Sequence, residues 1–338
     1  MKKHIYEIDF IRTLCCLGIV IYHFASHTNS NIGFLNYTVN YDIGSIIVTV
    51  FFMVSGFVLY HNNKEIKSLK AFYYKRFKSI FPSFWLCWFI FYVINVIKVR
   101  TPFYAGNPLK LLLTIIGQDG YFLQRVVNYY TVGEWFLGAL IIVYALYPLL
   151  LKGYKKNNIL TLAILIVLTA IVRLFNIPVI SPGFPGICEC CLKLYLGILL
   201  YEQINKLNKA TIIASIVYII AYTIIRFNYI NVGLDIIYSI CLFIVLYKLG
   251  SILIKNDQLN KTFKFIGGIS YQIFLLQHMV INYVFEFYNP SSTIPAILTL
   301  LICIVLTIIF AYIINLIIKK LMNTKLLKNI ENKLLLDK

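Results

Sequence analysis

The feature that most constrains the fold of this chain is a series of apolar segments, each about twenty residues long. A segment of that length crosses ~30 Å of hydrocarbon as an α-helix, at roughly 1.5 Å per residue. Hydrophobic residues make up 60% of the 338 residues and charged residues 13%, with a mean hydropathy of +0.80, which excludes an ordinary soluble domain. We therefore predict an all-α, polytopic transmembrane helix bundle. Its ten predicted spans are residues 5–26, 41–61, 80–97, 134–151, 159–176, 187–203, 210–225, 232–247, 265–287 and 295–318.

The basic residues predict how these spans are oriented. The chain has 31 Lys and Arg and a net charge of +18. With a cytoplasmic N-terminus, 23 of them fall in cytoplasmic segments, five outside and three within spans. This is the distribution that the positive-inside rule describes, so anionic membrane lipid explains the charge and a nucleic-acid partner is not needed. We predict a multi-pass protein with both termini cytoplasmic, a membrane domain over residues 1–322 and a basic cytoplasmic tail over residues 323–338.

The first span contains the strongest candidate for a functional site. Asp9, Arg12 and His23 lie within an otherwise apolar segment. An Arg near the middle of a span costs about 2.5–3.5 kcal/mol on insertion scales, so such residues usually face a bundle interior or a wet cavity. Arg12 and His23 are eleven residues apart, which is three helical turns to within about 20°. We predict that one face of this helix carries the stripe Asp9, Arg12, Cys16, Ile19 and His23.

Two further segments carry candidate residues, each with a simpler alternative. Lys75, Arg76 and Lys78 alternate with aromatic residues just before Pro82, which we expect to open the third span. They are either a cytoplasmic membrane anchor or a phosphate-binding patch. Glu134 and Trp135 follow a long external connection, residues 98–133, that contains a predicted interfacial helix at 109–116. They are either a solvated acid beside an interfacial anchor or part of a site.

The remaining polar residues give weaker signals. His278 lies within a predicted span without a charged neighbour in sequence, which favours a packing role, and His27 lies at a membrane boundary. Cys188 and Cys191 have a C-x2-C spacing, but no second Cys or His pair is near in sequence. We therefore predict no metal site.

Several segments together resemble the acyltransferase-3 family, the membrane acyltransferases that modify bacterial cell-surface glycans. DFIRTLCCLGIVIYHF is similar to the family's first helix, in which an Asp precedes an Arg by three residues and a His follows after ten more. VTVFFMVSGFVLY, FYYKRFKSIFPSFW and WFLGALIIVYALYP resemble three further family motifs. Two positions depart from the pattern: Ser79 stands where a second Arg is common, and Leu140 stands where many members have a Glu.

The resemblance implies an O-acyltransferase of the bacterial cytoplasmic membrane. An acyl group, acetyl in the simplest case, would pass from cytoplasmic acetyl-CoA (acyl-CoA) to a hydroxyl of a cell-surface polysaccharide, such as an exopolysaccharide, or of its lipid-linked precursor. His23 would act as general base and Arg12 as a donor-binding group supported by Asp9. Lys75 to Lys78 would bind the CoA, and Glu134 and Trp135 would face the acceptor. Direct transfer and an acyl-histidine intermediate both fit.

Two other classes of function fit parts of the sequence. In a transporter, the charged stripe of the first span would line a path for a lipid-linked glycan or a small solute. A non-catalytic membrane scaffold would leave the shared helix face of Arg12 and His23 without a purpose. Supplying labelled acetyl-CoA distinguishes these classes, because only an acyltransferase moves the label to a glycan.

Overall fold

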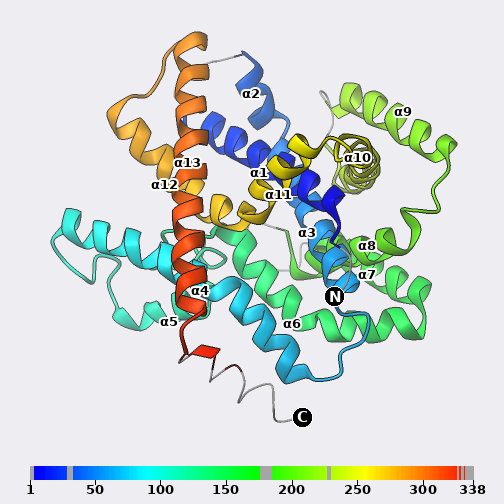
Figure 1. The fold of residues 1–338 in the computed structure, drawn as a ribbon, viewed down its shortest axis with the longest axis horizontal. Coiled ribbons are helices and arrows are strands. Elements are labelled where there is room, and N and C mark those ends of the chain that lie inside the picture. Colours follow the sequence, from blue (N-terminus) through cyan, green and yellow to red (C-terminus); the bar gives the residue numbers. More distant parts are fainter. Residues whose placement is uncertain are drawn as a thin grey trace. The chain divides into compact units, whose positions relative to one another are not determined.

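The computed structural model describes residues 4–28, 33–175, 185–226, 230–325, 327–328 and 331. The described residues are mostly helical and contain no strand, which confirms the all-α prediction (Figure 1). The chain divides into two compact units: unit 1 comprises residues 1–62 and 193–309, and unit 2 comprises residues 63–192 and 310–338. Most of the predicted tail over residues 323–338 lies outside the described residues.

Most helices belong wholly to one unit. Unit 1 contains α1 (Tyr6–His27), α2 (Gly33–Asn40), α3 (Ile43–Asn62), α9 (Lys209–Arg226), α10 (Val232–Leu253), α11 (Asp257–Gly268) and α12 (Ser270–Phe287). Unit 2 contains α4 (Leu69–Val99), the 3-10 helix η1 (Pro108–Lys110), α5 (Leu111–Ile115), α6 (Glu134–Lys156) and α7 (Asn158–Leu174). Of the three boundaries between the units, one directly follows α3, and the other two fall within α8 (Ile187–Gln203) and α13 (Thr293–Met322).

Seven described helices are long and apolar enough to cross a membrane: α1, α3, α4, α6, α9, α10 and α13. Each overlaps one of the ten predicted spans. The other three predicted spans correspond to α7, α8 and α12, which are shorter or less apolar. The structure therefore supports a polytopic helix bundle but does not confirm the predicted count of ten.

Two predicted boundaries are wrong. The predicted span 265–287 is two helices, because α11 ends at Gly268 and α12 starts at Ser270. Gly267 allows this turn to lie against α1, since a Cβ there would come within 2.8 Å of the Asp9 carbonyl oxygen. Pro82 does not open the third span but lies inside α4, which begins after Ser68, whose hydroxyl accepts a hydrogen bond from the Ala71 N–H.

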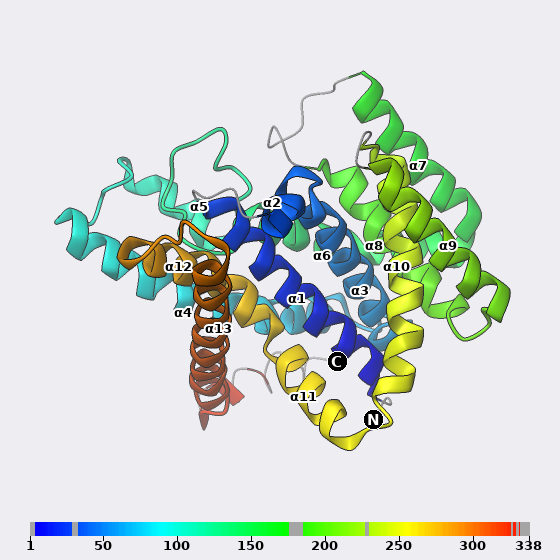
Figure 2. The ribbon, with the colours of Figure 1, turned by 90° about the horizontal axis from the view of Figure 1, so that it is seen from above.

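Unit 1 is organised around α1, which packs against α2, α3, α10, α11 and α12 (Figure 2). Small residues allow the closest approach of these helices. A Cβ on Gly44 of α3 would lie 2.8 Å from the Tyr22 ring of α1, and one on Gly18 of α1 would lie 2.8 Å from Ile47 of α3. The polar residues of α1 are consequently held within a packed bundle of apolar helices.

Candidate active site

His23 lies in a cluster of three histidines near the C-terminal end of α1. The His23 side chain is buried, and its ring centroid is 4.0 Å from that of His278 on α12. His27, one helical turn after His23, has its Nε2 3.0 Å from His278 Nδ1. Since neutral imidazoles share one hydrogen in such a bond, the tautomers of His27 and His278 are coupled. The cluster can therefore hold and pass a proton.

The sequence alone does not predict this cluster. His27 and His278 are 251 positions apart, and neither had a charged neighbour to suggest a partner. The one available signal was the spacing of four residues between His23 and His27, which places both on the same side of a helix. It could not indicate that α12 supplies the third imidazole.

Asp9 and Arg12 lie at the opposite end of α1. Asp9 is 3% exposed, and its carboxylate accepts a hydrogen bond from His4 Nε2 and lies 4.0 Å from Arg12 Nη1. The Arg12 side chain keeps 31% of its surface exposed, whereas Asp9, Cys16, Ile19 and His23 of the predicted stripe are buried. By helix rise, Arg12 and His23 are about 16 Å apart along the axis. Arg12 and His23 therefore lie on the same helix but are too far apart to contact the same group of residues.

In unit 2, Arg76 is the best-placed residue of the basic segment. Its guanidinium carbon lies 6.0 Å from the Phe72 ring centroid and 5.9 Å from that of Tyr144. Its Nε is buried and has no hydrogen-bond partner among the described residues. Lys75 is exposed, while Lys78 donates a 2.6 Å hydrogen bond to Glu331. Arg76 is therefore free to bind an anion, whereas Lys78 has its charge already neutralised.

Glu134 and Trp135 begin α6 in an unusual backbone conformation. Gly133 has φ 95° and Glu134 has φ 45°, a left-handed region that residues with a side chain rarely adopt. Gly120 fits against this turn, because a Cβ there would lie 2.4 Å from the Glu134 carbonyl oxygen. Trp135 follows on the same turn and has its ring centroid 6.3 Å from that of Phe136. The close packing of Gly120 therefore holds the backbone at Glu134 in this conformation.

A buried acid accompanies this turn within unit 2. Asp119 is 1% exposed, and burial raises its pKa to about 7, although a hydrogen bond from the Gly120 N–H opposes the shift. Burial, and then the charges of Glu134 and Asp119, raise the pKa of Tyr130 well above its usual value. The segment before α6 therefore holds two carboxyl groups near one phenol.

A model of the acyltransferase domain family matches residues 5–316, nearly the whole chain. This protein belongs to the acyltransferase-3 family. Searches of curated proteins and of solved structures found no match. The match confirms the resemblance read from the sequence, and with seven apolar helices it makes the chain a membrane acyltransferase.

For an acyltransferase, the arrangement separates two kinds of chemistry. The histidine cluster of unit 1 offers a base that can exchange a proton, and the guanidinium groups of Arg12 and Arg76 offer permanent positive charge for an anionic donor. The departure at Ser79 has a structural counterpart, because Lys78, one of the two lysines that could replace the missing Arg, is bonded to Glu331. Lys75 is the lysine that stays exposed.

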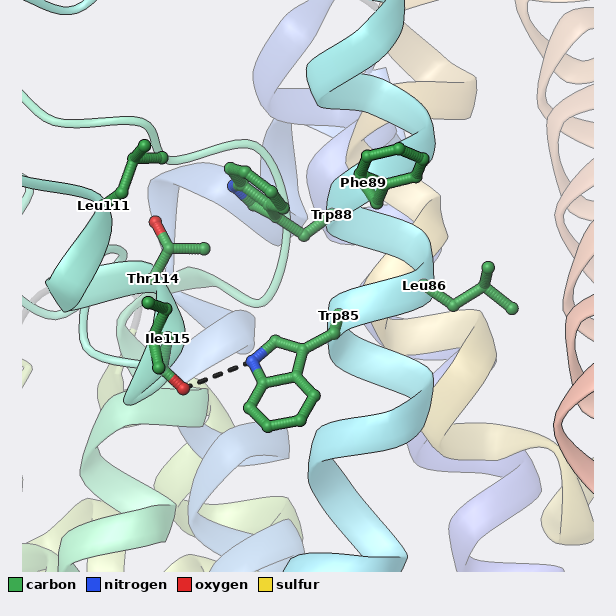
Figure 3. Close-up of a pocket in the computed structure, with 7 residues that line it drawn as sticks. All are labelled: Trp85, Leu86, Trp88, Phe89, Leu111, Thr114 and Ile115. Atoms are coloured by element: carbon green, nitrogen blue, oxygen red, sulfur yellow. Dashed lines mark hydrogen bonds between the residues drawn. The ribbon is translucent and has the colours of Figure 1, made fainter. Parts of the chain in front are cut away.

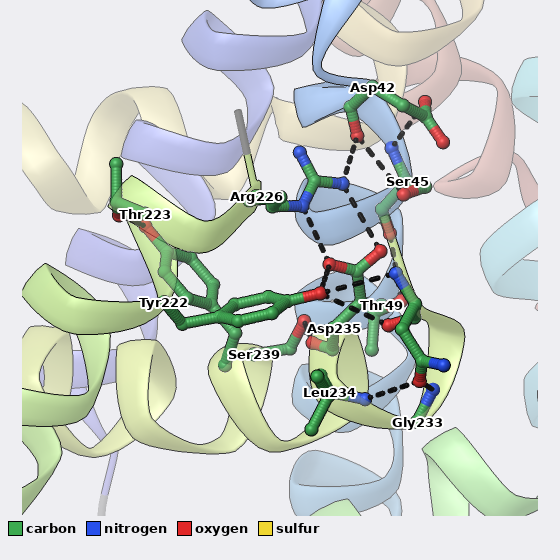
Figure 4. Close-up of polar contacts among 12 residues, drawn as sticks. Asp42, Ser45, Thr49, Tyr222, Thr223, Arg226, Gly233, Leu234, Asp235 and Ser239 are labelled. Carbon is green, nitrogen blue, oxygen red and sulfur yellow. Dashed lines mark hydrogen bonds and ion pairs between the residues drawn. The ribbon is translucent and has the colours of Figure 1, made fainter. Parts of the chain in front are cut away.

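A second polar cluster of unit 1 is an ion pair between α9 and α10. Arg226 of α9 donates from Nε to Asp235 Oδ1 at 2.6 Å and from Nη2 to Asp235 Oδ2 at 3.2 Å (Figure 4). Tyr222 donates to the same carboxylate at 3.1 Å, and Arg226 Nη2 also donates to the Asp42 carbonyl oxygen. The two opposite charges neutralise each other inside the bundle, as in ion pairs that hold helices together.

Proposed function

We propose that this protein is a membrane O-acyltransferase that transfers an acetyl or other acyl group from cytoplasmic acyl-CoA to a glycan hydroxyl. The acceptor is a cell-surface polysaccharide or its lipid-linked precursor, and the protein works as a multi-pass protein of the bacterial cytoplasmic membrane. The family match and the apolar helices support the class of enzyme. The histidine cluster around His23 is the observation that carries the chemistry.

In the proposed reaction, His23 accepts the proton of the acceptor hydroxyl. The hydroxyl oxygen attacks the thioester carbonyl carbon, a new C–O bond forms, and the C–S bond breaks. The proton held by His23 then passes to the departing CoA thiolate, directly or through His278 and His27. In the alternative of an acyl-histidine intermediate, a ring nitrogen of His23 attacks the thioester carbonyl carbon, the C–S bond breaks and CoA leaves as its thiolate. The sugar hydroxyl then attacks the acyl-histidine, the acyl C–N bond breaks, and the hydroxyl proton passes to the released imidazole or to the CoA thiolate.

The donor is proposed to bind through positive charge. A guanidinium binds phosphate oxygens bidentately and keeps its charge when it loses contact with water, so Arg12 and Arg76 suit the polar parts of acyl-CoA. The aromatic rings of Phe72 and Tyr144 beside Arg76 limit the directions in which its guanidinium can point. Lys75 adds exposed charge. Glu134 and Trp135 remain the proposed acceptor-side residues, since carboxylates bind sugar hydroxyls and indole rings stack on sugar faces.

The test is transfer in sealed vesicles with labelled acetyl-CoA supplied to the cytoplasmic face. We expect wild type to move the label to a glycan and His23→Ala to leave it on CoA, at equal protein level. If wild type moves glycan or solute across the membrane and leaves the label on CoA, the protein is a transporter and the proposal is wrong. Single-cysteine labelling at positions 36 and 67 tests the orientation, with position 36 expected outside.

A further inference from the structure

Three aromatic residues on one face of α4 hold the 98–133 segment of unit 2 in place. Trp85, Trp88 and Tyr92 are spaced by three and four residues, so their side chains lie on the same side of the helix. The three side chains donate hydrogen bonds to backbone carbonyls of the segment: Trp85 to Ile115 at 3.2 Å, Trp88 to Tyr129 at 2.8 Å and Tyr92 to Pro102 at 2.9 Å. The segment is therefore folded along α4 by specific bonds.

This arrangement leaves a groove of about 660 Å³ between α4 and α5 (Figure 3). Trp85, Leu86, Trp88 and Phe89 line it from α4, and Leu111, Thr114 and Ile115 line it from α5. Both indole N–H groups are already bonded to carbonyls, so the two tryptophans offer the groove only carbon atoms. Thr114 is the remaining polar side chain and is 2% exposed. An occupant of this groove must be hydrocarbon, since a polar ligand would find few partners.

The charge of the same segment indicates what the hydrocarbon is attached to. Residues 98–133 contain four of the five basic residues predicted to lie outside: Lys98, Arg100, Lys110 and Arg125. Their only acid is Asp119, which is buried. Lys110 directly precedes Leu111 of the groove, and its Nζ donates to the Ala105 carbonyl at 3.4 Å, which leaves two donors for another acceptor. Lys110 therefore places positive charge directly beside the groove, and Arg100 adds an exposed cation to the same segment.

We propose that the groove holds a hydrocarbon chain of an anionic phospholipid of the outer leaflet, whose phosphate is bound by Lys110 and Arg100. Such a lipid satisfies both observations, because its chain needs an apolar surface and its headgroup needs cations. A zwitterionic lipid would fill the groove without using the charge. The site lies outside the proposed catalytic residues and does not depend on the acyltransferase reaction.

The experiment uses the small number of tryptophans. The chain has three, so Trp135→Phe leaves Trp85 and Trp88 as the only indoles, both lining the groove. The full-length variant is placed in nanodiscs that contain phospholipid brominated on its acyl chains, and tryptophan fluorescence is measured without acyl-CoA. We expect brominated phosphatidylglycerol to quench several-fold more than brominated phosphatidylcholine at equal mole fraction. Equal quenching by the two lipids would mean bulk lipid only and would overturn the proposal.

Charge variants test the headgroup contact. Lys110→Glu with Arg100→Glu should abolish the preference for phosphatidylglycerol, whereas the control Lys152→Glu, an exposed lysine of α6, should retain it. Lys110→Gln alone should weaken the preference, and it serves if the double variant does not assemble. A preference that persists in Lys110→Gln and the double variant would overturn the assignment. Release of brominated phosphatidylglycerol by a polyprenyl phosphate at a mole fraction far below that at which unlabelled phosphatidylglycerol releases it would assign the groove to a lipid-linked acceptor instead.

Discussion

Unit 1 contains two buried polar clusters that differ in how their charge is arranged. Around Arg226 and Asp235, a guanidinium and a carboxylate are joined by two hydrogen bonds, and Tyr222 satisfies the carboxylate further. Around His23, the partners are imidazoles, which are neutral or charged according to the protons they hold. The first cluster cancels its charge within itself, and the second can gain or lose a proton.

The two clusters predict different consequences for a buried ionisable residue in a membrane helix. An ion pair within the bundle is expensive to break but has no capacity for reaction while it is closed. A group of imidazoles is less costly to keep neutral and can act as a base. Each of the following variants tests this distinction.

The largest effect is expected from His23→Gln, which retains a polar side chain but removes the base. Activity should fall by about 10²–10⁴-fold, the range of general acid–base catalysis, while membrane level and thermal stability stay near wild type. Glycan acetylation per unit of protein measures the activity. The amount of protein in the membrane fraction measures its level, and the fraction that stays soluble when the detergent extract is heated measures its thermal stability. Near-normal acetylation would give His23 the same structural role as Arg226.

Asp235→Ala should show the opposite pattern. It leaves the buried Arg226 charge unpaired, at a cost of about 3–5 kcal/mol, so the amount of folded protein should fall strongly while activity per folded molecule is retained. The double variant Asp235→Leu with Arg226→Met removes both charges and should restore most of the stability. A stable single variant with lost activity would show that this ion pair takes part in the reaction.

His278→Gln should reduce activity by less than the loss of His23 does. A partner that positions a reacting group is worth up to about 10²-fold when its loss displaces that group. The reduction should appear in kcat, and the pH–rate profile should change shape because one titrating imidazole is gone. His278→Ala with unchanged kinetics and an unchanged pH profile would reduce the cluster to His23 alone.

The smallest effect is expected from Arg76→Ala in unit 2. A lost charge-assisted contact with the donor should raise the apparent KM for acyl-CoA about tenfold and leave kcat near wild type. Lys78→Ala is the matched control, because Lys78 is already bonded to Glu331 and should matter less to the donor. A larger KM effect from Lys78→Ala than from Arg76→Ala would reverse this assignment.

The sequence by itself determined the class of the protein and the course of its first helix. Apolar length predicted α1, α3, α9 and α10 to within a few residues, except at the end of α10, because a helix in hydrocarbon must satisfy its own backbone hydrogen bonds. Motif spacing along single helices also identified the acyltransferase-3 family before the comparison confirmed it. Each of these features depends on a single short segment, so the sequence of that segment is enough to predict it.

Only the tertiary structure decided which residues meet. The bond between His27 and His278 joins helices that are far apart in the sequence, and the bond between Lys78 and Glu331 joins α4 to the C-terminal segment. The break after Gly268 lies where Gly267 approaches Asp9 closely, a contact that hydropathy does not register. In the sequence, Arg226 is one of five basic residues predicted to lie outside, and only the structure shows that it pairs with Asp235. These contacts form when distant segments pack together, and the sequence of one segment does not indicate which other segment it will contact.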